Sequence, residues 1–307
     1  MKINEFNNVV WCDLGIIILK IHSHSKWDAK MVYTCETRDP AKPIVNVYIC
    51  RENDSIFNNP KTYRENAMRQ GLYRGHHFGL PANLKYIDEN NIAISHHDPG
   101  KIIWCYVIKY VLTLHAIKKD MLHIKGGAIS YKGKSFLFLG RGGSGKTEII
   151  NALCKNGASF MANTHLLIND NFVYGIKSNV RVRDNGQDIY VPMNHLQEKN
   201  VCNEWMPIGG IFWVNYRTDG KTIIKKIPTN YALSNLQWFT ESISNWEMKE
   251  DFVDYFGLDP FKFGEQMNKI SKMLNSLCSN NIVYYLNADI FSDDGLSKTI
   301  SFMESIR

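Results

Sequence analysis

A glycine-rich stretch in the middle of the chain constrains the fold more than any other feature. It fits the pattern G-x-x-x-x-G-K-[ST], with the residues Gly140, Arg141, Gly142, Gly143, Ser144, Gly145, Lys146 and Thr147. The glycines let backbone N–H groups turn inward around a phosphate, because no Cβ stands in the way. Lysine can reach the β- and γ-phosphates, and the threonine hydroxyl can ligate Mg²⁺. The pattern therefore predicts a loop that binds a nucleoside triphosphate with Mg²⁺.

The residues on either side of the loop predict a strand before it and a helix after it. Residues 135–139 form a short apolar run of the kind found in buried strands. Residues 147–154 place Ile149, Ile150 and Leu153 on one helical face, and the Asn-Gly pair at 156–157 is a helix stop signal. A loop that leads into a helix N-terminus favours an anion, because the helix dipole is positive there. The sequence therefore predicts an α/β fold.

The length and composition are those of a globular protein. The chain has 307 residues, enough for one large domain or two of ordinary size, and 44% of them are hydrophobic. The longest apolar segment, 102–117, contains Lys109 and His115, so it is predicted to be a core helix and not a membrane span. Residues 1–8 lack the apolar core of a signal peptide. We therefore expect a cytoplasmic protein without a membrane partner.

Cysteine use and charge exclude two further classes. The seven cysteines are scattered and form no C-x-x-C pair, which argues against a disulfide framework and against a cysteine zinc site. The formal net charge is +6, but the basic residues are not gathered into one run. A nucleotide-binding protein needs some positive field, so this charge does not indicate a nucleic-acid partner.

Patterns along the chain predict a β-rich N-terminal region, 1–100, and a P-loop domain, 101–307. The N-terminal region has predicted strands over 8–20, 31–34 and 44–49. The second region begins with a helix over 102–119 and continues with a β-hairpin, whose arms are 127–131 and 134–139 around a Lys-Gly turn. Further predicted strands are 159–162, 166–168, 172–175, 208–216, 222–227 and 282–286, and further helices are 231–238, 261–277 and 292–306.

This arrangement resembles the HPr kinase/phosphorylase family and its HPr-kinase-like relatives, which share a core with phosphoenolpyruvate carboxykinase. The resemblance rests on the hairpin, the loop that follows it, and Glu148 directly after the Lys-Thr pair. It covers roughly 122–183 and continues weakly to the C-terminus. It implies that Lys146 stabilises the phosphates, that Thr147 and Glu148 hold Mg²⁺, and that a γ-phosphoryl group passes to a hydroxyl. Other acidic candidates for the metal are Asp170, Asp184 and Asp188.

The sequence departs from the family where the family has a paired Asp-Asp after the P-loop helix, one of which is the general base. Asn163 and Thr164 occupy those positions, and neither can act as a base near neutral pH. His165 follows directly and could act as the base, because an imidazole titrates in the right range. It faces the site only if this stretch is a turn or a strand end. The alternative is a surface histidine or one that supports the site from behind.

Two further residues are candidates through the resemblance. The family has a histidine before the hairpin, and His123 is the nearest match, although Lys125 falls at the ungapped position. His123 could line the phosphate site or be a hydrogen-bonded core residue. Arg181 and Arg183 lie on one face of a predicted strand, where they could bind phosphate oxygens or form a solvated edge. The family often has an arginine near here, which favours Arg183 as a functional residue.

Two histidine pairs, 76–77 and 96–97, suggest a metal cluster at first sight. Adjacent histidines on a strand diverge, and apart from Asp98 no acidic or cysteine ligand has a consistent spacing. Turn residues surround both pairs. We therefore expect a structural loop or a loop that contacts the acceptor, rather than a zinc site.

The sequence favours an ATP-dependent kinase that acts on a hydroxyl acceptor, either a serine of a peptide or protein or a small biosynthetic metabolite. Two alternatives stay open. One is an ATP-binding regulator without catalysis, because the Asp pair is missing. The other is an adenylyl-transfer or ligase-type enzyme that uses the same loop. The sequence leaves open the acceptor, the role of the N-terminal region, and whether the protein is a homo-oligomer.

Overall fold

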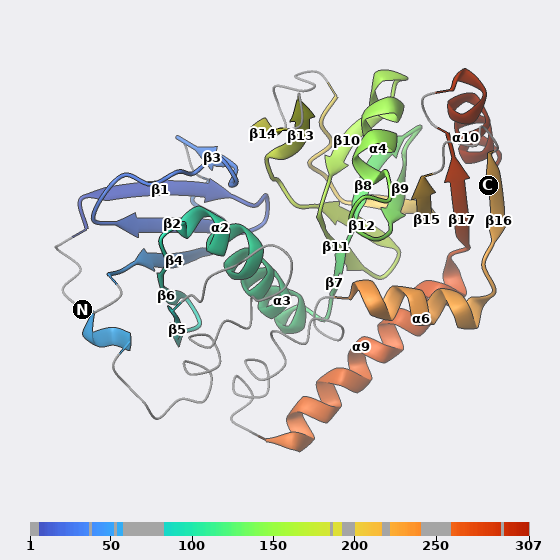
Figure 1. Cartoon of the computed structure of the whole chain (residues 1–307). Helices are drawn as coiled ribbons and strands as arrows, with labels where there is room; N and C mark the ends of the chain where they lie inside the picture. Colours follow the sequence, from blue (N-terminus) through green and yellow to red (C-terminus); the bar gives the residue numbers. More distant parts are fainter. Residues whose placement is uncertain are drawn as a thin grey trace. The chain divides into compact units, whose positions relative to one another are not determined.

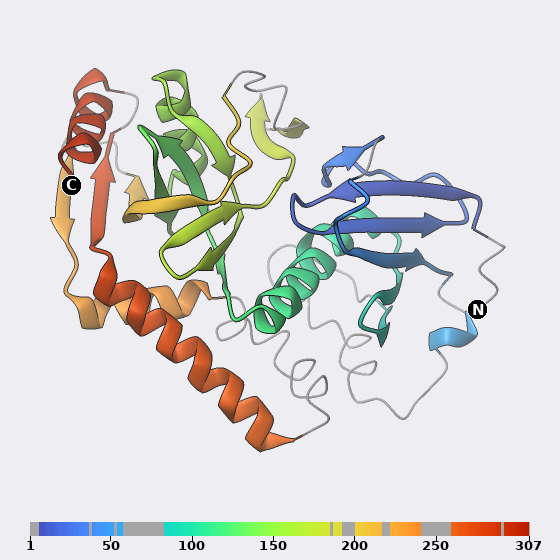
Figure 2. The ribbon, with the colours of Figure 1, turned by 180° about the vertical axis from the view of Figure 1, so that it is seen from behind.

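The computed structural model of the chain describes residues 6–36, 39–51, 54–57, 83–184, 187–191, 200–216, 222–240, 259–289 and 292–306. It is a mixed α/β protein with separate sheets and helices (Figures 1 and 2). The chain divides into two compact units, each assembled from three stretches. Unit 1 comprises Met1–Leu112, Lys177–Pro192 and Trp246–Pro260, and unit 2 comprises Thr113–Ile176, Met193–Asn245 and Phe261–Arg307.

The division between the units differs from the predicted boundary at residue 100. It lies between Leu112 and Thr113, inside helix α3 (Ile108–Lys118). Unit 1 also includes a later stretch that contains the strand pair β13 (Val180–Asp184) and β14 (Gln187–Val191). A single cut in the sequence cannot reproduce an arrangement in which the chain returns to its first unit.

Unit 1 is built on a six-stranded mixed sheet with the order β3-β1-β2-β4-β6-β5. Its strands are β1 (Asn8–Asp13), β2 (Ile18–Ser23), β3 (Thr34–Cys35), β4 (Ile44–Ile49), β5 (Asn83–Asp88) and β6 (Asn91–Ser95). β2, β4 and β6 are neighbours and run parallel, while β1, β3 and β5 pair antiparallel. The predicted strand 44–49 is confirmed, whereas 31–34 contains only the first residue of β3.

A long helix follows β6. It is continuous from Pro99 to Lys118 and consists of α2 (Pro99–Ile102), one π-helical turn, η3 (Ile103–Val107), and α3. Asp98 caps its first turn by accepting a hydrogen bond from the Lys101 N–H. It is the one described helix long and apolar enough to cross a membrane, but 72% of its most apolar window is buried in the protein, as in the core helix of a soluble protein.

The second stretch of unit 1, Lys177–Pro192, makes polar contacts with the N-terminal stretch of the same unit. The Lys177 ammonium donates to the Asp13 carboxylate at 2.7 Å, and the Lys42 ammonium donates to the other oxygen of the same carboxylate at 3.1 Å. The Asn179 side-chain amide donates to the Lys30 carbonyl at 2.7 Å and to the Val32 carbonyl at 2.8 Å. These contacts join parts of unit 1 that are far apart in the sequence.

Unit 2 is built on a nine-stranded sheet. Its strands are β7 (Leu122–Lys125), β8 (Gly127–Tyr131), β9 (Lys134–Leu139), β10 (Ser159–Ala162), β11 (His165–Asn169), β12 (Phe172–Gly175), β15 (Met206–Tyr216), β16 (Ile223–Lys226) and β17 (Val283–Ala288). The long strand β15 lies between β9 and β17 and is parallel to both, and its first residues pair with β12. The sheet order is β10-β8-β9-β15-β12-β11-β7. Off this order, β17 also pairs with β15, and β16 pairs with β17.

Four helices accompany this sheet in the described part of unit 2 (Figures 1 and 2): α4 (Lys146–Lys155), α6 (Thr229–Phe239), α9 (Pro260–Asn280) and α10 (Asp293–Ser305). The core is formed by apolar side chains of the strands together with those of α6 and α9, including Leu137, Leu166, Ile211, Leu236 and Leu274. The predicted hairpin is confirmed: β8 and β9 pair antiparallel around Lys132 and Gly133. Both turn residues have positive φ, 50° and 76°, as a two-residue hairpin requires.

Candidate functional site

The glycine-rich loop connects the end of β9 to the start of α4, as the sequence predicted. Gly143 and Gly145 have φ values of 76° and 86°, a backbone conformation that favours glycine. Gly140 is required for a different reason: a Cβ there would lie 2.5 Å from the Ser144 Oγ and 2.7 Å from the Val214 carbonyl oxygen. The loop therefore folds tightly on itself at its first residue and exposes Arg141, Gly142 and Gly143 to solvent.

Lys146 crosses back over the loop. Its ammonium donates to the carbonyl oxygens of Gly140 and Arg141, both at 2.8 Å, and lies 3.4 Å from the Ser144 hydroxyl. The side chain is half-buried, so the charge is held in one place next to the N-terminus of α4. Two sources of positive potential, an ammonium and a helix N-terminus, thus meet at one loop, which makes it an attractive site for an anion.

Thr147 contacts Asn163, one of the two residues that replace the family's Asp pair. Its hydroxyl donates to the side-chain oxygen of Asn163 at 3.1 Å. Asn163 lies just after β10, in the bend before β11, and both side chains are half-buried. A neutral amide therefore stands beside the hydroxyl that would ligate a metal. The amide oxygen can accept a hydrogen bond, but it supplies no negative charge and cannot remove a proton.

Glu148 is exposed in the first turn of α4. Among the other acidic candidates, Asp170 lies in the turn between β11 and β12, while Asp184 and Asp188 lie in β13 and β14 of unit 1. No group of three or more His, Cys, Asp or Glu side chains that could hold a metal is found among the described residues. A Mg²⁺ ion at the loop would take its other ligands from phosphates and water.

His123 and His165 lie together inside the unit 2 sheet. His123 comes from β7 and His165 from β11, two strands that pair directly. The His123 Nε2 lies 3.1 Å from the His165 Nδ1, and the other ring nitrogen of His123 lies 2.8 Å from the Thr113 hydroxyl. The side chains are only 2% and 1% exposed. A base must reach the proton that it removes, so the buried position argues against His165 as the general base and for a hydrogen-bonded core pair.

Arg183 lies in β13, which belongs to unit 1, whereas the loop belongs to unit 2. The structure does not bring it together with the loop inside one unit. Of the histidine pairs, 76–77 lies outside the described residues, and His96 and His97 follow β6 in unit 1. The structure thus brings the loop, Lys146, Thr147 and Asn163 together at one place in unit 2.

Sequence reasoning missed two contacts. It marked Asn163 as a substitution for a carboxylate but did not identify the residue as the partner of Thr147. It also missed the pairing of His123 with His165, which are 42 positions apart. No family model matches the chain, and no curated protein matches it. The function is therefore inferred from the geometry of the site itself.

Proposed function

We propose that the protein is an ATP-dependent phosphotransferase and that unit 2 is its HPr-kinase-like P-loop core. It transfers the γ-phosphoryl group of ATP to the hydroxyl of a serine in a peptide or protein, or of a small metabolite. One observation supports this most strongly: a complete phosphate loop between a buried strand and a helix carries the Lys146 ammonium across it and the Thr147 hydroxyl at its end. The hairpin formed by β8 and β9, which comes directly before the loop, also supports the resemblance to the HPr-kinase-like family.

The residues present fit the phosphates of a nucleotide. The Lys146 ammonium now binds two loop carbonyls and would exchange them for oxygens of the β- and γ-phosphates. N–H groups at the start of α4 would bind the same anion. Thr147 would hold Mg²⁺, with Asn163 orienting the hydroxyl from behind. Bound Mg²⁺ neutralises charge on the phosphate oxygens.

The reaction does not require a strong base from this protein. The bond between the γ-phosphorus and the bridging oxygen breaks, a bond to the acceptor oxygen forms, and the hydroxyl proton leaves to solvent. Such transfers depend mainly on alignment and on neutralisation of charge. The neutral Asn163 is compatible with a kinase for this reason, but it weakens any case for the reverse, phosphorolytic reaction of the family's bifunctional members.

A second candidate function is supported by the same residues. Asn163 is not a base, and His123 and His165 are buried. An ATP-binding regulator that uses nucleotide binding as a signal, without turnover, needs only the loop and Lys146. An adenylyl-transfer or ligase-type enzyme that uses the same loop is a third candidate function.

One experiment separates the three. The protein is incubated with ATP, Mg²⁺ and a panel of peptides and hydroxylated metabolites, and the nucleotide product is identified by chromatography. ADP that forms only when an acceptor is present, together with the phosphorylated acceptor, indicates a kinase. AMP with pyrophosphate indicates adenylyl transfer, and ATP binding without any product indicates a regulator. Lys146→Ala should abolish ATP binding and turnover. Lys155→Ala is the matched control, because Lys155 is an exposed lysine at the opposite end of the same helix.

A further inference from the structure

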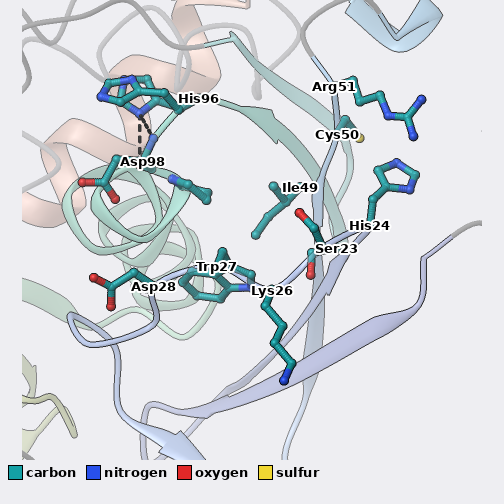
Figure 3. Close-up of a pocket in the computed structure, with 13 residues that line it drawn as sticks. Ser23, His24, Lys26, Trp27, Asp28, Ile49, Cys50, Arg51, His96 and Asp98 are labelled. Carbon is teal, nitrogen blue, oxygen red and sulfur yellow. Dashed lines mark hydrogen bonds between the residues drawn. The ribbon is translucent and has the colours of Figure 1, made fainter.

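Unit 1 contains a cavity of about 530 Å³ at one edge of its sheet (Figure 3). The cavity lies where the three parallel strands end. β2 ends at Ser23, β4 ends at Ile49, and β6 is followed by His96 and His97, and all four residues line the cavity. In open sheets with parallel strands, ligands bind in the crevice outside the carboxyl ends of those strands. The cavity is also within the size range of small-molecule sites.

The wall of the cavity is built by close packing between a loop and a helix. The loop after β2 carries Trp27 and Asp28, and it lies against the first turn of the 20-residue helix at Gly100. A Cβ on Gly100 would lie 2.4 Å from the Asp28 carbonyl oxygen and 3.3 Å from the Trp27 ring. The Trp27 ring, which the loop carries, therefore lies close to the start of the helix. It forms part of the lining of the cavity, as Figure 3 shows.

Two buried donors in the lining have no hydrogen-bond partner among the described residues. Ser23 is 1% exposed, and its hydroxyl is unpaired. The indole N–H of Trp27 is also buried and unpaired. Buried polar groups in native proteins are normally hydrogen-bonded, so two unpaired donors at one cavity need an explanation. Because both can donate, a ligand with acceptor oxygens would satisfy both.

Two cations and two carboxylates line the cavity. Lys26 and Arg51 contribute cations, and Arg51 is exposed at the side opposite Trp27 in Figure 3. The two acidic side chains in the lining are already engaged: the Asp28 carboxylate pairs with Lys30 at 2.6 Å, and Asp98 caps the helix. The same helix begins at Pro99, which lines the cavity, and the Asp98 carboxylate offsets part of the positive potential at this helix end.

We infer that unit 1 binds a small oxyanion, a molecule with a carboxylate or phosphate group and an apolar part that packs on Trp27. The oxyanion lies between Arg51 and the helix start and accepts hydrogen bonds from Ser23 and from the indole N–H. Ile49 and the Trp27 ring supply the apolar contact. The cavity belongs to unit 1 and the nucleotide loop to unit 2, and the inference does not depend on the proposed kinase activity.

The test reads the Trp27 indole N–H directly. Full-length, ¹⁵N-labelled protein is titrated with inorganic phosphate, O-phosphoserine, citrate and indole-3-acetate, and the indole signal is assigned by its loss in Trp27→Phe. The titrations are repeated on Lys146→Ala, so that binding at the nucleotide loop does not contribute. We expect at least one probe to shift the Trp27 signal in a saturable way. The phosphate and carboxylate probes distinguish the two oxyanion types.

Two variants and one control decide whether the shift reports this cavity. Arg51→Ala should weaken the binding of the effective probe at least tenfold, and Ser23→Ala should weaken it several-fold. Arg51 is exposed, so its loss should not unfold the protein. Lys20→Ala, which removes a cation of β2 that does not line the cavity, should leave the affinity unchanged. The inference is wrong if no probe shifts the Trp27 signal, or if Arg51→Ala and Ser23→Ala both bind as the wild type does.

Discussion

The imidazole rings of His123 and His165 face each other across two paired strands, with 3.1 Å between the Nε2 atom of the first and the Nδ1 atom of the second. One hydrogen lies between these nitrogens when both rings are neutral, so the tautomer of one ring fixes the tautomer of the other. The Thr113 hydroxyl, 2.8 Å from His123, extends the same chain of hydrogen bonds. The three side chains therefore form one buried polar network.

The network predicts coupled stability effects. His123→Ala and His165→Ala should each lower the free energy of unfolding by about 2 kcal/mol, because each removes the buried hydrogen bond between the two rings. The double variant should cost about 1 kcal/mol less than the sum of the two, since both single variants lose the same hydrogen bond and the sum counts it twice. Urea unfolding at pH 8 measures all three. Strictly additive costs would contradict the network.

Gly140 predicts a steric effect on the loop. Gly140→Ala places a Cβ against the Val214 carbonyl and the Ser144 hydroxyl, so it should displace the loop, lower thermal stability by several degrees and weaken ATP binding at least tenfold. Gly142→Ala is the control: nothing lies within 4 Å of a Cβ there. Thermal unfolding and nucleotide titration test both variants. Equal stability of the two would contradict the close packing at Gly140.

The contact between Thr147 and Asn163 predicts an effect on metal dependence. Asn163→Asp adds a carboxylate next to the hydroxyl that would hold Mg²⁺, so the Mg²⁺ concentration needed for half-maximal ATP binding should fall about tenfold. Asn156→Asp adds the same charge at the exposed C-terminal end of α4 and should have little effect. An identical response of the two variants would show that Asn163 does not act at the metal. Thr147→Val should raise the Mg²⁺ requirement.

Asp13 predicts a dependence of stability on acid. Burial alone would raise the pKa of its carboxyl, but hydrogen bonds from Lys177, the Gly15 N–H and Lys42 outweigh it and hold the pKa below the ordinary value of 3.8. A carboxyl whose pKa is lowered by folding stabilises the protein above that ordinary value and loses the effect as the pH falls through the folded pKa. Asp13→Asn should therefore cost about 2 kcal/mol at pH 7.

The difference between wild type and Asp13→Asn should shrink as the pH falls below about 4. Urea unfolding between pH 2.5 and pH 7 measures it. Asp28→Asn is the control, because the Asp28 ion pair with Lys30 is exposed and should contribute at most about 0.5 kcal/mol. A difference that stays constant across this pH range would contradict the role given to the Asp13 carboxylate.

Local patterns predicted much of unit 2. The hairpin β8–β9, the strands β10 and β12 and the helix α4 follow from short apolar runs, turn residues and a helix stop, all of which act between near neighbours. The phosphate loop was predictable for the same reason, because its glycines and Lys146 act within eight consecutive positions.

Pairing between distant segments could not be predicted in this way. Whether His165 faces a site or a neighbouring strand depends on β7 lying beside β11, and periodicity says nothing about which strands become neighbours. The cavity in unit 1 was missed because β6 was not predicted, and without it the parallel set of three strands could not be recognised. Trp27 and Ser23 also carry no motif. They stand out only in the structure, where the Ser23 hydroxyl and the Trp27 indole N–H are buried without a hydrogen-bond partner among the described residues.

The return of the chain to unit 1 has a consequence for synthesis. Asp13 is translated long before its partner Lys177, which lies 164 positions later in the sequence. The carbonyls of Lys30 and Val32 are likewise translated long before Asn179, the residue that donates hydrogen bonds to them. A nascent chain that ends within α3 therefore contains the strands of the unit 1 sheet but lacks Lys177 and Asn179, whose side chains bind this part of unit 1. Unit 1 is complete only after Trp246–Pro260 has been translated, so an N-terminal fragment is a poor starting point for studying unit 1 alone.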